Sequence, residues 1–120
     1  MSTLTLTIPA PCDWINANQR LHWAEKARRT RAWRNAADYA ATVAAHDSFL
    51  VPVRITITVH KPRGGRWDAT NLAPTGKALV DGLVDAGVCV DDSNQYVVGP
   101  DMRAGEKRAE PCVVVEVSPL

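Results

Sequence analysis

Aspartate residues are concentrated in one part of this sequence. Between residues 68 and 101 there are six aspartates and a single lysine, Lys77. Asp68 follows a glycine-containing loop, and the adjacent pair Asp91 and Asp92 follows an apolar run. Carboxylates are ligands for hard cations such as Mg²⁺ and Mn²⁺, and such an ion can activate water for attack on a phosphodiester. If Asp68 and the aspartate pair converge, the pattern predicts a metal site with Lys77 as a positive charge for the transition state.

The same aspartates also allow a structural interpretation. Asp68 can be a turn residue, Asp81 and Asp85 can be solvated positions on a helix, and the pair at 91–92 can form a turn. Neighbouring residues on an extended chain point to opposite faces, so the two members of the pair are expected to differ in role. Spacing alone leaves both interpretations open.

The dipeptide Gly76-Lys77 is similar to the end of a nucleotide-binding loop. That loop needs a glycine five positions before Gly76 and a serine or threonine after Lys77. The chain has Asn71 and Ala78 at these positions. We therefore expect no nucleotide cofactor.

Basic residues are concentrated in a second segment, from Arg20 to Arg34. It has six basic residues and one acid, Glu25, whereas the rest of the chain carries a net charge of −4. A basic element beside an acidic cluster suggests a protein that holds a polyanion such as DNA against metal ions, and solvated charge on two exposed faces is the alternative. The residues expected to contact DNA phosphates are Arg20, Lys26, Arg28, Arg29, Arg31 and Arg34.

The tryptophans and cysteines give weaker indications of function than the charged residues. Trp14, Trp23 and Trp67 are candidates for stacking on bases exposed at a branch point, with core packing as the alternative, and Trp33 is expected in the core. The three cysteines are far apart and form no C-x-x-C pair, which suits a reducing cytosol and argues against zinc fingers or a disulfide framework. We expect Cys89 to be a small buried residue rather than a nucleophile.

Hydrophobic periodicity predicts four strands and two helices. Alternating apolar residues indicate strands, and apolar residues at three- and four-residue spacing indicate an alanine-rich helix. The second helix has Pro74 in its first turn and Gly87 at its end. The expected fold class is α+β, a small two-layer sandwich with a mixed sheet packed with two helices, in the order β-α-β-α-β-β. In chain order, the expected elements span residues 3–8, 21–46, 52–62, 74–87, 95–103 and 111–119.

Length and composition are ordinary for a soluble globular protein. The 120 residues are sufficient for one domain with its own core, and 46% of them are hydrophobic and 22% charged. No apolar segment reaches the roughly 20 residues that cross a bilayer. The first ten residues have neither the basic region nor the long apolar region of a signal peptide. We expect a single domain over residues 1–120, located in the cytoplasm, without membrane contact.

The segment from residue 68 to residue 92, "DATNL…KALVDGLVDAGVCVDD", resembles the core motif of the RusA family of Holliday junction resolvases. In that family D-x-D-N-L is followed by a lysine, a helix reading roughly D-x-L, a glycine, an apolar run and a D-D pair. The upstream "HKP" and the following "VV" are also similar, and the N-terminal half is similar more loosely. The resemblance implies a small α+β sandwich and Mg²⁺-dependent nicking of four-way DNA junctions by a homodimer, common in phages and prophages.

Residue by residue, the resemblance implies catalytic roles for Asp68, Lys77 and Asp92. It also implies that Asp68 and Asp92 hold the metal ion, with Asp91 beside them as a further ligand or as the cap of a turn. Asn71 is expected to orient the loop of the site.

The chain departs from the family pattern at two points. The second family aspartate is Thr70 here, a neutral hydroxyl and a poor metal ligand, and residues 74–76 are an apparent insertion before Lys77. The first departure removes a charge from the metal site, which Asp81 or Asp91 can replace. The second lengthens the chain between Asn71 and Lys77 relative to the family pattern.

The sequence therefore predicts a metal-dependent endodeoxyribonuclease for branched DNA, with Mg²⁺ as cofactor and Mn²⁺ as a substitute. Because resolution of a four-way junction needs two symmetric nicks, a homodimer is the expected assembly. The expected location is the cytosol of a bacterial host, with a phage or prophage as a source. The alternatives are a junction- or DNA-binding protein of the same fold without catalysis, and a nuclease for flaps or forks.

Overall fold

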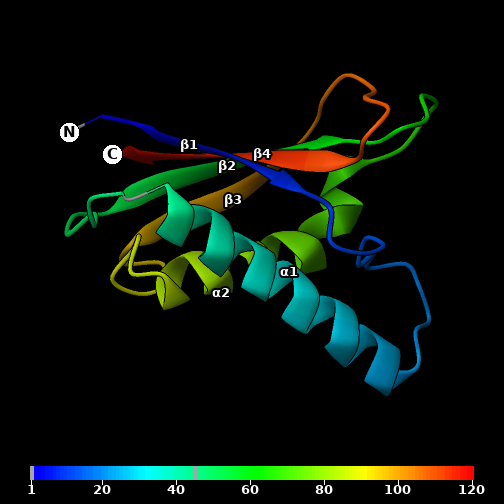
Figure 1. The fold of residues 1–120 in the computed structure, drawn as a ribbon, viewed down its shortest axis with the longest axis horizontal. Helices are drawn as coiled ribbons and strands as arrows, with labels where there is room; N and C mark the ends of the chain where they lie inside the picture. The colour runs from blue at the N-terminus through cyan, green and yellow to red at the C-terminus, as the bar shows by residue number, and fades with distance from the viewer. Residues whose placement is uncertain (1, 45) are drawn as a thin grey trace.

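The computed structural model describes residues 2–44 and 46–120. The chain folds as α+β, with a four-stranded mixed sheet packed with two helices, in the expected order of elements (Figure 1). No helix in these two ranges is both long and apolar enough to cross a membrane. The elements are β1 (Leu4–Pro9), α1 (Trp23–Val43), β2 (Val53–His60), the short 3-10 helix η1 (Ala69–Leu72), α2 (Ala73–Asp85), β3 (Val97–Ala104) and β4 (Cys112–Pro119).

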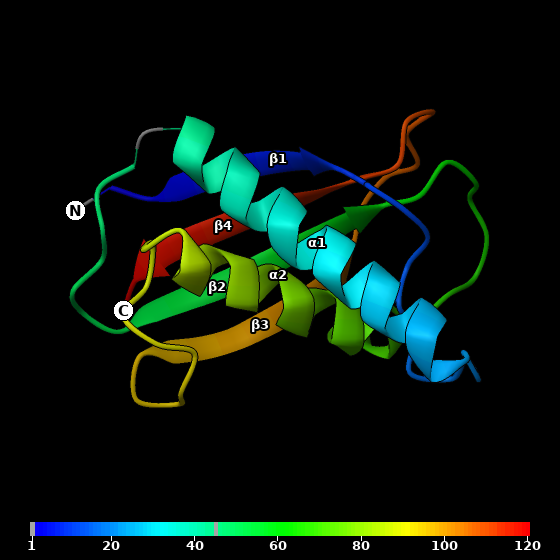
Figure 2. The same cartoon turned by 60° about the horizontal axis from the view of Figure 1, so that its bottom comes forward.

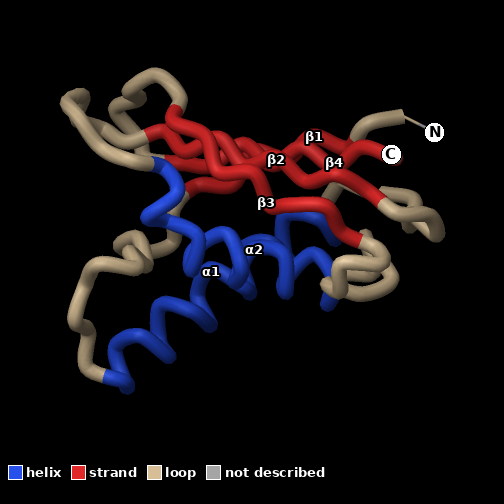
Figure 3. Tube along the Cα trace, turned by 180° about the vertical axis from the view of Figure 1, so that it is seen from behind, coloured by secondary structure: helices blue, strands red, loops and turns tan. Residues whose placement is uncertain are grey.

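The sheet has the strand order β1-β4-β2-β3. Strand β4 is antiparallel to both β1 and β2, whereas β2 and β3 are parallel. Side chains alternate between faces along a strand, and the apolar positions Val53, Ile55, Ile57 and Val59 of β2 are fully buried. Both helices cover this face of the sheet, which makes the molecule two layers thick (Figures 2 and 3).

The ends of the helices follow the expected signals. Helix α2 has proline in its first turn, and Gly87, just after the C-cap Ala86, has a φ of 78°, a conformation that favours glycine. Helix α1 lies within the expected range and carries Trp33 on its buried face. The apolar run after α2 forms one isolated bridge, between Cys89 and Phe49.

The two helices approach each other closely at Gly82. A Cβ atom on Gly82 would lie 2.1 Å from the backbone oxygen of Arg34 and 2.8 Å from the Cβ of Ala37. Ala37 and Ala41 are fully buried, so small side chains line the contact from α1 as well. The distance between the basic helix and the aspartates of α2 is therefore set by residues that have almost no side chain.

We expect Gly82→Ala to lower the free energy of unfolding by about 1–3 kcal/mol, because the added methyl meets backbone of α1 that cannot rotate away. Gly76→Ala on the same helix is the matched control. Its Cβ first meets the Sδ of Met102, at 2.6 Å, and that flexible side chain can move. Urea unfolding of both variants measures the difference. Equal stabilities would contradict a rigid contact at Gly82.

Candidate functional site

Lys77, in the second turn of α2, is the centre of the candidate site. Its Nζ donates a hydrogen bond to Oδ1 of Asp81 at 2.8 Å and a second one to Oδ2 of Asp92. Asp81 lies one turn further along α2, and Asp92 lies in the loop that follows the helix. The fold therefore joins the lysine to the second member of the aspartate pair, 15 residues away in the sequence.

The three charged side chains lie at the surface, with Asp81 the most buried of them. Hydrogen bonds to Asp81 and then Asp92 raise the pKa of Lys77, and the bond from Lys77 lowers the pKa of Asp92. The side chain of Lys77 is 60% exposed and that of Asp92 is 38% exposed. A ligand that carries charge can therefore reach both without a change of fold.

Asp91 makes a different contact from its neighbour Asp92. Its Oδ1 accepts a hydrogen bond of 2.7 Å from the backbone N–H of Asp92. This contact holds the turn after α2 and so orients Asp92 toward Lys77. Of the two adjacent aspartates, one faces the lysine and the other shapes the loop.

Asp68 caps the short helix η1 at the other end of α2. Its Oδ1 accepts hydrogen bonds from the backbone N–H of Thr70 at 3.0 Å and from the Thr70 hydroxyl at 2.7 Å. These two bonds lower the pKa of Asp68, the hydroxyl contributing most. The backbone oxygen of Asn71 accepts a hydrogen bond from the N–H of Ala17 at 2.8 Å, which attaches the loop before α1 to this turn.

The carboxylates do not form a complete metal cage. Over residues 2–44 and 46–120, no three His, Cys, Asp or Glu side chains lie close enough together to hold a metal ion, so Asp68 does not complete a set with Asp81 and Asp92. However, Asp81 and Asp92 already converge on one cation, the Lys77 ammonium. Mg²⁺ sites often use one or two carboxylates completed by waters and phosphate oxygens. The donor chemistry of this pair fits Mg²⁺ or Mn²⁺ bound together with a phosphate.

The basic helix reaches this acidic cluster through Arg34. Its guanidinium makes two hydrogen bonds to Asp85 on α2, at 2.6 and 2.8 Å. The pKa of Arg34 is raised, mainly by Asp85, with smaller contributions from the nearby charges of Asp81 and Asp92. The basic face of α1 and the carboxylates near Lys77 therefore lie next to each other.

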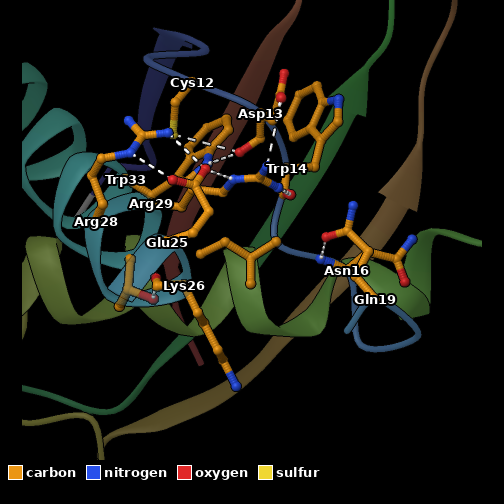
Figure 4. Close-up of polar contacts among 12 residues, drawn as sticks. Cys12, Asp13, Trp14, Asn16, Gln19, Glu25, Lys26, Arg28, Arg29 and Trp33 are labelled. Atoms are coloured by element: carbon orange, nitrogen blue, oxygen red, sulfur yellow. Dashed lines mark hydrogen bonds and ion pairs between the residues drawn. The ribbon is translucent and has the colours of Figure 1, made fainter. Parts of the chain in front are cut away.

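Part of the basic segment has a structural task. Glu25 accepts hydrogen bonds from Arg28 and Arg29, all between 2.7 and 2.8 Å, which lower the pKa of Glu25 to about 2 (Figure 4). The side chain of Arg29 is only 11% exposed and also donates to the backbone oxygen of Trp14 at 3.0 Å. Arg29 therefore attaches the preceding loop to α1 rather than pointing into solvent.

The other predicted DNA contacts are unpaired. Among the residues that the structure describes, Arg20, Lys26 and Arg31 form no salt bridge. Lys26 and Arg31 line an open groove of about 630 Å³ along α1, together with Trp23, whose side chain is exposed. The first half of α1 projects away from the sheet, so this surface is accessible (Figures 1 and 3).

The remaining tryptophans divide between core and surface. Trp33 is fully buried, stacks on Trp14 with 5.0 Å between ring centroids, and donates a hydrogen bond to the backbone oxygen of Asp13. Trp67 is half-buried in the loop before Asp68. Trp14 is also half-buried, so Trp23 is the tryptophan with the most exposed ring and Trp33 is the one that no base could contact.

The histidines and Cys89 have structural environments. Nδ1 of His22 accepts a hydrogen bond from the N–H of Ala24 and so caps α1. His60 is buried, with Nδ1 2.8 Å from the backbone oxygen of Glu106. Burial raises the pKa of Cys89 to about 11, so its thiol is protonated at neutral pH and is a poor nucleophile.

Three ion pairs of the basic segment were not anticipated. The pairing of Glu25 with Arg28 and Arg29 has a signal in the sequence, since residues three and four apart on a helix are neighbours. The contact between Arg34 and Asp85 has none, since the two residues are 51 positions apart in the sequence. It depends on the packing of α1 on α2.

Comparison with known proteins does not assign this site. No family model matches the chain, and no curated protein matches its sequence. Its function must therefore be inferred from the residues and contacts described above.

Proposed function

We propose that this protein is a metal-dependent endonuclease of the RusA type, which nicks branched DNA and has the four-way junction as its substrate. One observation carries the proposal, the convergence of Asp81 and Asp92 on Lys77. The resemblance of residues 68–92 to the RusA motif implies that Lys77 and Asp92 act in one site. Their contact, between residues 15 positions apart in the sequence, supports that implication.

In this proposal Asp92 and Asp81 would hold Mg²⁺, and Asp91 orients Asp92 through its hydrogen bond to the backbone. When bound, the ion supplies a water activated for attack on phosphorus and neutralises developing negative charge. Lys77 turns its ammonium toward the oxygens of the reacting phosphate and stabilises their charge in the transition state. One oxygen of Asp68 caps η1, and its other carboxylate oxygen is available to contact the substrate.

DNA would lie along the outer face of α1. Phosphates can be contacted by Arg20, Lys26 and Arg31 without breaking any salt bridge within the protein. Arg29 keeps its structural contacts. A homodimer provides two such sites related by the two-fold symmetry of a junction. The DNA path along α1 and the homodimer are both parts of this proposal.

A second candidate is a DNA-binding protein of this fold without catalysis. The hydrogen bonds from Thr70 to Asp68 favour it, because they engage a carboxylate that a metal ion would otherwise use. The small number of converging carboxylates favours it as well. The two candidates differ in whether the DNA is cut.

Thr70→Asp separates the two candidates at the residue level. The substitution removes the hydroxyl that engages Asp68 and adds the carboxylate that the RusA motif has at this position. We expect nicking at limiting Mg²⁺ to rise roughly tenfold, which corresponds to about 1.4 kcal/mol of binding free energy. Thr70→Val is the matched control, since it removes the hydroxyl without adding charge. An unchanged or lower rate for Thr70→Asp would contradict a contribution of residue 70 to the metal site that Asp81 and Asp92 would form.

The experiment that tests the proposal is incubation of the protein with a labelled synthetic four-way junction, with and without divalent metal. We expect nicks that depend on metal. Because Thr70 leaves the site short of one carboxylate, we expect more product in Mn²⁺, which accepts less ideal ligand sets, than in Mg²⁺. A shifted band without product in either metal would favour the DNA-binding protein.

A further inference from the structure

Two loops meet at one end of the sheet. Residues 61–67 follow β2, and residues 105–108 lie between β3 and β4. The backbone N–H of Arg108 donates to the oxygen of Lys61 at 3.0 Å, and the N–H of Gly105 donates to the oxygen of Val59 at 2.9 Å. Figures 1 and 2 show the two loops side by side beyond the ends of β2 and β4. Their bases are therefore fixed to each other.

The loops enclose an open pocket of about 260 Å³ lined by four cations, Lys61, Arg63, Arg66 and Lys107, and by no carboxylate. Within the described ranges, none of these four residues forms a salt bridge. This distinguishes them from the basic helix, where several arginines are paired. Four uncompensated positive charges around one pocket are a strong attraction for an anion.

Trp67 forms one wall of the pocket. Its half-buried ring packs against the hydrophobic core, and Nζ of Lys61 lies 4.3 Å from the ring centroid. This cation–π contact holds one of the four charges in place. Gly65 has a φ of 120°, a conformation that favours glycine, so the shape of the loop depends on that residue. The pocket is therefore a formed site with an aromatic surface and unpaired cations.

We propose that this pocket binds the phosphates of a DNA strand and is a second contact site, apart from the basic helix. The inference rests on the proposed function. Several cations beside an aromatic ring can bind successive phosphates of a DNA strand while a base stacks on the ring. At about 260 Å³ the pocket is also small for an enclosed organic ligand, for which roughly 300–1,000 Å³ is usual.

The place of the pocket in the fold agrees with this assignment. Trp67 directly precedes Asp68, so a strand held in the pocket passes the turn that leads into α2. Figures 1 and 3 place these loops and the first half of α1 at the same end of the molecule. The longest dimension of the chain is 36 Å, about the length of one turn of B-DNA, so one DNA arm can reach both surfaces.

The test uses Arg63→Ala, Lys107→Ala and the double variant, since both residues are exposed and contribute nothing to the core. Arg54→Ala is the matched control. It removes the same charge from the sheet, where Arg54 pairs with Asp101, and it does not line the pocket. The affinity of each protein for a fluorescent four-way junction is measured at several salt concentrations without divalent metal.

We expect each pocket variant to weaken binding several-fold and to flatten the slope of log K against log salt by about 0.9, and the double variant to flatten it by about twice as much. Arg54→Ala should match the wild type. Wild-type affinity and slope in the double variant would overturn this inference alone, whereas a wild type that does not bind the junction would overturn the proposed function with it. Displacement of the DNA by inorganic phosphate at an equal concentration of phosphate groups would indicate a single-anion site and overturn the assignment to a strand.

Discussion

Asp92→Asn is expected to abolish metal-dependent nicking of a four-way junction, a loss of at least about hundredfold, since a charged group that stabilises the transition state contributes that much or more. Junction binding should stay as tight as in the wild type or become tighter. The substitution removes a negative charge next to DNA phosphates and leaves the basic residues in place. Loss of cleavage with retained binding is the signature of a carboxylate that acts on metal rather than on DNA.

The measurement is single-turnover nicking together with a gel-shift affinity for each variant. Asp47→Asn serves as the matched control, because Asp47 is also exposed, lies in the loop between α1 and β2, and is not one of the carboxylates that pair with Lys77. Asp68→Asn is expected to lose cleavage as well. Full cleavage by Asp92→Asn would remove that residue from the site.

Lys77→Met is expected to reduce nicking by about hundredfold and, at the same time, to tighten the binding of Mn²⁺. The first effect follows from the loss of a positive charge at the reacting phosphate. The second follows because the ammonium now neutralises Asp81 and Asp92, and two carboxylates without a partner attract a divalent cation more strongly.

The opposite signs of these two effects make the experiment informative. Mn²⁺ binding is measured by the electron paramagnetic resonance signal of the free ion, and nicking is measured at saturating metal. Lys77→Arg is the control that keeps the charge. If Lys77 only stabilises the fold, Lys77→Met should show reduced stability with unchanged nicking per folded molecule, contrary to our expectation.

The secondary structure could be predicted from the sequence because its signals are local. Alternation identified β2, and Pro74 and Gly87 marked the ends of α2. The strand order could not be predicted in this way. Strand β4 lies between β1 and β2, and this pairing of distant segments has no periodic signature in the chain.

The candidate site was predictable to a similar degree. The contact between Lys77 and Asp81 follows from a four-residue spacing on a helix. The spacing left the approach of the aspartate pair to Lys77 as one of two interpretations, and the resemblance to the RusA motif singled out Asp92. The four cations around Trp67 were missed because Lys107 comes from a loop about 40 residues further along the chain. Contacts between distant loops depend on the sheet that carries them.

The role of Thr70 could also be recognised only in the structure. From the sequence, Thr70 was a missing carboxylate. In the fold it is a hydrogen-bond donor that holds Asp68 at the start of η1. A donor at this position engages one oxygen of Asp68, in addition to removing a charge from the site. The residue type alone did not indicate this contact.

The most direct test of our proposal is cleavage of a synthetic four-way junction labelled at the 5′ end of each strand in turn, with wild-type protein in Mg²⁺, in Mn²⁺ and in the presence of a chelator. We predict metal-dependent nicks at symmetry-related positions on two opposing strands. Retarded but uncut junction in every metal condition would contradict the assignment of this protein as a nuclease.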